Sequence, residues 1–127
     1  MRRAELIIHQ EPVAKGRPRF TRSGFAFTPS KTRYAEKLLK DELKIKFQEK
    51  PFDTAIRVSV FFGITKPKSV KRKYPAVKPD VDNYAKIILD SANGVLWLDD
   101  SLICSLRAEK RYAEQGFIQI VIEEICD

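Results

Sequence analysis

The segment Ala55-Ile-Arg-Val-Ser-Val-Phe-Phe-Gly-Ile64 decides the fold class. It is rich in β-branched and aromatic residues, which favour a strand. Apolar residues also alternate along it, so that one side collects Ile56, Val58, Val60 and Phe62. Alternation of this kind is typical of a strand with one buried face. We therefore predict a central strand over residues 55–64.

Two helices are predicted on either side of this strand. The first spans residues 28–48, because Thr28-Pro29 suits a helix start and apolar residues then recur every four positions, at Ala35, Leu39, Leu43 and Phe47. The second spans residues 82–93 and ends at Asn93-Gly94, where glycine accepts a left-handed backbone. Both helices should pack their apolar faces on the sheet.

Further strands are predicted at residues 4–9, 102–108 and 117–125, with a small hairpin over residues 20–27. The predicted order is β, hairpin, α, β, α, β, β. The fold class is α/β (α+β): a mixed, mainly antiparallel sheet packed against two helices. A length of 127 residues with 43% apolar content indicates one compact domain over residues 1–127.

Several classes of protein are disfavoured. No apolar run approaches the length of a signal peptide core or a membrane span, so we expect a cytoplasmic protein without a membrane partner. The two cysteines, Cys104 and Cys126, form no CxxC or Cys/His spacing, so neither a disulfide framework nor a structural zinc site is indicated.

Charge is distributed unevenly along the chain. The net charge is +7, but residues 1–79 hold 20 basic and 7 acidic residues (+13), whereas residues 80–127 hold 4 and 10 (−6). Because Lys and Arg displace counterions from phosphates, nucleic acid is the expected partner. The acidic part is either a site for a cation or an acidic surface tail, and charge alone does not decide between them.

Two acidic motifs lie in this second part: Asp80-Val-Asp82-Asn-Tyr-Ala-Lys86 and Trp97-Leu-Asp99-Asp100. An extended backbone at Asp80–Asp82 would turn both carboxylates to one side. Gathering three carboxylates is unfavourable without a cation, and oxygen ligands suit Mg²⁺, with Mn²⁺ as a substitute. Such a site activates water for phosphodiester hydrolysis. Lys86 would hold that water or neutralise transition-state charge.

A plainer interpretation stays open for each acidic residue. Asp-x-Asp before a helix is common as an N-cap with surface charge. Asp99 and Asp100 are also typical turn residues after a buried tryptophan, and Asp90 suits an ion pair with Lys86 as well as a ligand role. The roles of Asp90 and Asp99 are therefore left undecided.

The full pattern Asp80-x-Asp82-Asn83-x-x-Lys86-x-x-x-Asp90, Asn93-Gly94, Trp97-x-Asp99-Asp100 resembles the signature of RusA-type Holliday junction resolvases. The resemblance implies that Asp80, Asp82 and Asp100 are catalytic metal ligands and that Lys86 is a functional lysine. It also implies a homodimer with two active sites, Mg²⁺ dependence and paired symmetric nicks across a four-way DNA junction.

The binding surface is expected upstream of these acids. Residues 66–79 form a loop with six basic residues and no acidic one. A solvated charged loop is the plainer reading, but the adjacent acids favour DNA binding. The primary candidates are Lys66, Lys68, Lys71, Arg72 and Lys73, and the secondary candidates are Arg17, Arg19, Lys110 and Arg111.

Two other functions compete with junction resolution. A noncatalytic basic module would bind nucleic acid and carry the acids only as surface charge. A metal-dependent nuclease for flaps or RNA would share the chemistry but read another shape. Substrate preference, metal count and the dimer interface are not encoded in any motif of the sequence.

Overall fold

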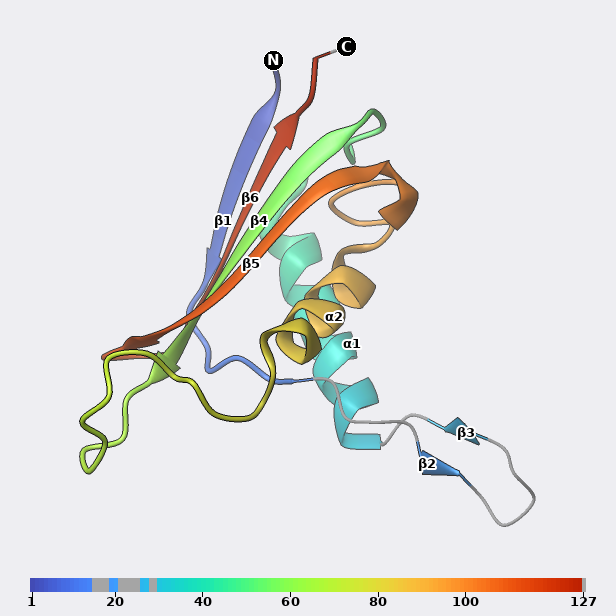
Figure 1. Ribbon diagram of the computed structural model, residues 1–127. Helices are drawn as coiled ribbons and strands as arrows, with labels where there is room; N and C mark the ends of the chain where they lie inside the picture. The colour runs from blue at the N-terminus through green and yellow to red at the C-terminus, as the bar shows by residue number, and fades with distance from the viewer. Residues whose placement is uncertain (15–18, 21–25, 28–29, 127) are drawn as a thin grey trace.

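A curved four-stranded sheet forms the body of the molecule (Figure 1). The computed structural model describes residues 1–14, 19–20, 26–27 and 30–126. The sheet contains β1 (Arg3–Ile8), β4 (Ile56–Thr65), β5 (Ile103–Ala113) and β6 (Phe117–Glu124), in the order β1-β6-β4-β5. β6 pairs antiparallel with both β1 and β4, and β4 pairs parallel with β5. The predicted mixed, mainly antiparallel sheet is confirmed.

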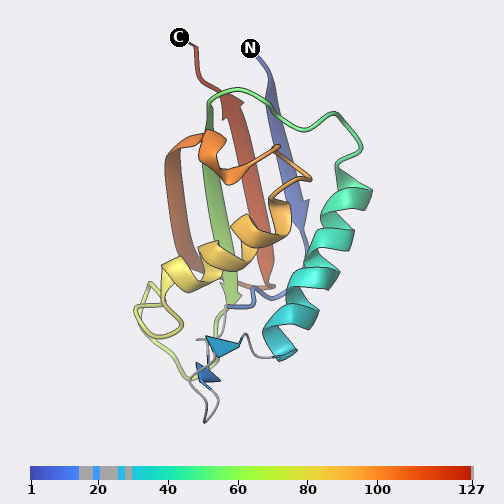
Figure 2. The same ribbon diagram turned by 90° about the vertical axis from the view of Figure 1, so that its right-hand side faces the viewer.

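The two helices lie on one face of this sheet (Figure 2). They are α1 (Ser30–Lys46) and α2 (Val81–Ala92), and α2 forms the crossover between the parallel strands β4 and β5. The predicted end of the first helix at residue 48 and the predicted bounds of the second, 82–93, agree with these within two residues. The start of the first helix at Thr28-Pro29 lies outside the described residues.

The core fills the layer between sheet and helices. The four alternating residues of the central strand are all fully buried, as predicted. The largest buried side chains also include Trp97, Phe52 and Leu43. Full burial of an apolar side chain of this size contributes roughly 1.5–3 kcal/mol relative to exposure. Most of the described buried apolar residues form one connected cluster, which holds α1 and α2 against the strands.

Two glycines occupy positions that other residues would strain. Gly94 has a φ of 80° directly after α2, which confirms the left-handed stop predicted from Asn93-Gly94. Gly63 pairs with Phe117 across β4 and β6, and a Cβ at Gly63 would lie 2.1 Å from the Phe117 ring. The absence of a side chain at Gly63 therefore lets the Phe117 ring cover the strand.

Three local expectations change in the structure. The predicted strand 102–108 begins one residue later and continues to Ala113, and the short 3₁₀ helix η1 (Asp100–Leu102) precedes it. The hairpin is present as β2 (Arg19–Phe20) paired with β3 (Ala26–Phe27), but its turn lies outside the described residues. Finally, α2 starts at Val81, so the segment Asp80–Asp82 is not an extended strand.

Candidate active site

The first acidic motif lies at the start of α2. Asp80 is the N-cap residue, with extended backbone angles (φ −68°, ψ 148°), yet its side chain makes no capping hydrogen bond. The backbone carbonyl of Asp80 accepts from the Asn83 N–H at 3.1 Å, so the helix start is closed by the main chain. The plainer interpretation gave Asp80 the role of an N-cap side chain. The exposed Asp80 carboxylate does not fill that role, because it makes no capping hydrogen bond.

Asp82 and Lys86 lie one helical turn apart on the exposed side of α2. The Lys86 Nζ lies 3.6 Å from Asp82 Oδ2, and the two side chains are 58% and 66% exposed. An exposed pair of this spacing contributes only about 0.3–0.5 kcal/mol. Both groups therefore stay accessible to a ligand at little cost to folding.

The loop before Asp80 is held by Lys110 of β5. The Lys110 Nζ donates to the carbonyl oxygens of Val77 and Pro79, at 2.6 and 2.9 Å. Two of its three donors are thus used to fix the loop. Lys110, one of the secondary candidates for DNA contact, thus also fixes the position of Pro79, the residue next to Asp80.

The basic loop itself is exposed beside this site. Lys66, Lys68, Lys71, Arg72 and Lys73 are all exposed. Tyr112 of β5 anchors two of them: the Arg72 Nε donates to the Tyr112 hydroxyl at 3.1 Å, and the Lys66 Nζ lies 5.7 Å from the centre of its ring. The other three cations project from a loop that ends at Asp80. The primary candidates thus lie on the loop that leads along the chain into the first acidic motif.

The secondary candidates are placed differently. Arg111 packs 4.9 Å from the Phe61 ring centre and lies near Glu109, on the sheet face that carries no helix. It is therefore on the other side of the sheet from α2. Arg17 lies outside the described residues, and only the backbone of Arg19, in β2, is described.

The second acidic motif lies at the other end of α2. Trp97 pairs with Asn93, directly after the helix, and its buried indole Nε1 donates to Asp100 Oδ1 at 2.7 Å. Asp80 and Asp100 are therefore separated by the length of a 12-residue helix. At about 1.5 Å per residue this is roughly 18 Å. Among the described residues, no group of three acidic, His or Cys side chains is placed to hold one metal ion.

Asp99 and Asp100 have different local roles. The Ser101 N–H donates to Asp99 Oδ2 at 2.9 Å, so Asp99 caps η1. Hydrogen bonding to Ser101 lowers the pKa of the Asp99 carboxyl and keeps it ionised. Asp99 thus acts as the turn residue that the plainer interpretation describes. Trp97 binds Asp100 through Oδ1, so the second carboxylate oxygen, Oδ2, takes no part in that hydrogen bond.

The sequence did not single out Glu11, which ties the chain before α1 to the end of β4. Its carboxylate accepts from the Thr65 N–H at 2.9 Å and from the Thr65 hydroxyl at 2.6 Å. Burial, and secondarily the charge of Glu11, raise the pKa of Tyr84 on the first turn of α2. A single Glu between short motifs carries no pattern that would have revealed this role.

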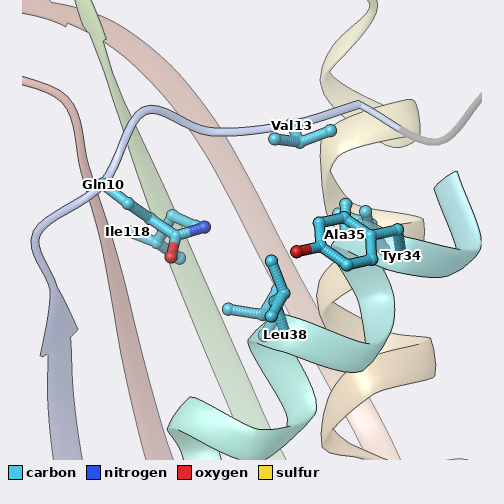
Figure 3. Close-up of a pocket in the computed structure, with 8 residues that line it drawn as sticks. Gln10, Val13, Tyr34, Ala35, Leu38 and Ile118 are labelled. Carbon is cyan, nitrogen blue, oxygen red and sulfur yellow. The ribbon is translucent and has the colours of Figure 1, made fainter. Parts of the chain in front are cut away.

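An apolar pocket of about 210 Å³ lies away from these charges (Figure 3). It opens between α1 and the segment after β1, and Figure 3 shows Tyr34 and Leu38 of α1 opposite Gln10 and Ile118. None of its lining residues is charged. The pocket therefore offers no group for phosphate chemistry.

Exposed carboxylates at a helix start, after a strongly basic loop, are features expected of a small nuclease. The family is shown by sequence comparison: residues 9–123 match the family described as "Endodeoxyribonuclease RusA", and the chain belongs to that family. This membership implies endodeoxyribonuclease activity. The resemblance noted from the acidic motifs is thereby confirmed.

A relative from Bacillus subtilis (strain 168) extends over nearly the whole chain. It is named "Uncharacterized protein YqaN" and is 32% identical over 140 residues, which covers 95% of this chain and 96% of the relative.

Within the described residues, no helix is long and apolar enough to cross a membrane.

Proposed function

We propose that this chain is a Mg²⁺-dependent, structure-specific DNA endonuclease that resolves Holliday junctions by paired symmetric nicks, in DNA recombination and repair. The observation that carries the proposal is the free carboxylate of Asp80 at the start of α2, directly after a loop of exposed cations. We further propose that residues 1–127 form one domain and that the protein acts in the cytoplasm.

The residues at the start of α2 divide the work. Asp80 and Asp82 supply hard oxygen ligands, the donor type that Mg²⁺ or Mn²⁺ prefers over nitrogen and sulfur. A bound ion of this kind supplies an activated water and offsets charge on the phosphate. Lys86, 3.6 Å from Asp82, is placed to neutralise charge that develops on the phosphodiester. Lys110 keeps Asp80 in position through the carbonyls that precede it.

In this proposal, the Asp100 that completes each site comes from a second copy of the chain. Within one copy it lies roughly 18 Å away, at the far end of α2. In a homodimer with two-fold symmetry, the Asp100 end of one copy can meet the Asp80 end of the other. Two such sites are formed at once, which suits two matched cuts in a symmetric junction.

A labelled four-way junction tests the activity directly. With Mg²⁺ we expect nicks at symmetric positions in two opposing strands, and with a chelator in place of Mg²⁺ we expect binding without nicks. Competition among junction, flap, duplex and RNA substrates ranks the shapes. Binding without cleavage under all metal conditions would favour the noncatalytic module, and preferred cleavage of flaps or RNA would favour the other nuclease.

Because the loop at residues 66–79 is strongly basic, we predict that DNA affinity depends strongly on salt concentration. With about six phosphate contacts, we expect affinity to fall roughly a thousandfold between 50 and 200 mM salt. Replacing Lys71 and Lys73 by Gln should reduce the slope of log affinity against log salt by about two, since each phosphate contact contributes about one. A titration by fluorescence anisotropy measures both, and a flat response in the native chain would contradict the proposed binding surface.

A further inference from the structure

A surface pocket of about 360 Å³ lies where the basic loop leaves the sheet. It is lined by Lys66, Tyr112, Ala113 and Glu114. Thr65 and Ala113 pair at the ends of the parallel strands β4 and β5, and the Lys66 N–H donates to the Ala113 carbonyl at 3.1 Å. The pocket is therefore built on the ends of two paired strands. Its volume is within the range of small-ligand sites, roughly 300–1,000 Å³.

Tyr112 supplies this pocket with an aromatic ring. Tyr112 is half-buried and pairs with Ile64 of β4, which packs on the core. The Arg72 Nε donates to the Tyr112 hydroxyl at 3.1 Å, and the Lys66 Nζ lies 5.7 Å from the ring centre. The hydroxyl contact holds one edge of the ring, whereas a cation over a partly exposed ring is held only weakly. A ligand that stacks on the ring can therefore displace Lys66.

The charges of the pocket favour a neutral polar ligand. Lys66 and Glu114 are both exposed and place opposite charges on its wall. Glu114 repels a phosphate, so the cations further along the loop suit the DNA backbone better than this pocket does. A nucleobase is flat and neutral, stacks on aromatic side chains, and has N–H groups that donate to a carboxylate.

The pocket lies close to the start of α2. Tyr112 and Lys110 are two residues apart on β5, so their side chains lie on the same face of the sheet, about 7 Å apart along the strand. The Lys110 Nζ donates at 2.9 Å to the carbonyl of Pro79, the residue before Asp80. A DNA strand with a phosphate at Asp80 can therefore present a nearby base to Tyr112.

We propose that this pocket takes one unpaired nucleobase from the branch point of the DNA, stacked on Tyr112, and in this respect the inference rests on the proposed function. Stacking is interrupted where the arms of a junction meet, so a base there unpairs at a lower cost than a base within an arm. A base in an intact duplex stays paired and does not enter. The loop cations bind both kinds of DNA through phosphates, and Tyr112 favours the branched kind.

Binding titrations in the presence of a chelator test the pocket without any cleavage. For Tyr112→Leu we expect affinity for a four-way junction to fall at least about fivefold, and affinity for an intact duplex to change less than about twofold. Tyr112→Phe keeps the ring and should retain most of the junction affinity that Tyr112→Leu loses. Tyr74→Leu is the matched control, because Tyr74 is an exposed tyrosine (67%) on the same loop but outside the pocket.

Three results of these titrations would overturn the proposal. Equal losses on junction and duplex, or a loss as large for Tyr112→Phe as for Tyr112→Leu, would mean that Tyr112 acts only as an anchor for Arg72. An equal junction-specific loss in Tyr74→Leu would assign the effect to the loop as a whole.

Photo-cross-linking tests the contact in the native chain, so it does not depend on how any variant folds. A junction with 5-iodouracil at the branch point, irradiated in complex with the protein, should cross-link to Tyr112, because this base reacts with an aromatic ring that stacks on it. The same base placed inside a paired arm is the control and should not reach Tyr112. A cross-link map from which Tyr112 is absent, or in which the arm position gives as much product, would contradict the assignment.

The outcomes separate this inference from the proposed function. If Tyr112→Leu loses affinity for junctions alone but the native chain nicks no junction with Mg²⁺, the base pocket stands and the proposed activity fails. If the native chain nicks junctions and Tyr112→Leu binds them as tightly as the native chain does, the activity stands and the base pocket is wrong.

Discussion

An Asp82→Asn variant is expected to lose at least about a hundredfold in Mg²⁺-dependent junction cleavage, while its DNA binding and its thermal stability stay unchanged. The amide keeps the size of the carboxylate but removes the negative charge that a divalent ion requires. Folding should be unaffected, because Asp82 is exposed and its ion pair with Lys86, at 3.6 Å, contributes little to stability. Single-turnover cleavage of a labelled junction, together with a binding titration, measures the effect.

Asp41→Asn is a suitable control for the loss of one negative charge. Asp41 is an exposed acid on α1 and has no place in the proposed site. We expect this variant to cleave like the native chain. Native cleavage by Asp82→Asn would remove Asp82 from the list of metal ligands, and a fall in its thermal midpoint would mean that the residue has a structural task instead.

Mixing two inactive variants, Asp82→Asn and Asp100→Asn, is expected to restore cleavage. If each site combines the start of α2 from one copy with Asp100 from the other, half of the sites in a mixed dimer carry both substitutions and the other half carry neither. The intact site should nick one strand of a junction. If each site lay within one copy, every site in the mixed dimer would carry one substitution and stay inactive.

The restored activity should follow the composition of the mixture. At equal amounts, random exchange makes half of the dimers mixed, so we expect about one quarter of the native number of active sites. The products should be single nicks, because only one site per mixed dimer is intact. Each variant alone is the control. No activity at any mixing ratio, with subunit exchange demonstrated by a tag, would contradict the shared site.

Much of the fold was predictable because its signals are local. The alternation at residues 55–64 and the stop at Asn93-Gly94 correctly indicated β4 and the end of α2. The far end of β5 was not predicted, because residues 109–113 carry several charges and no apolar alternation. They form a strand because β4 offers hydrogen-bonding partners as far as Thr65, which pairs with Ala113.

The pairing of strands also lay beyond the sequence. β5 and β6 follow each other along the chain, separated only by residues 114–116, which is typical of a hairpin. In the structure β4 lies between them, parallel to β5 and antiparallel to β6. The choice depends on α2, which carries the chain back across one face of the sheet so that β5 runs in the same direction as β4.

The sequence by itself determined the family and the start and end of α2. It also contained the two acidic motifs, together with Lys86 and the basic loop at residues 66–79. Only the tertiary structure decided that Asp80 and Asp100 lie at opposite ends of α2, and that Lys110 and Glu11 support the site's surroundings. The physical reason is that a motif records spacing along the chain, whereas a rigid helix fixes how far apart in space its two ends must lie.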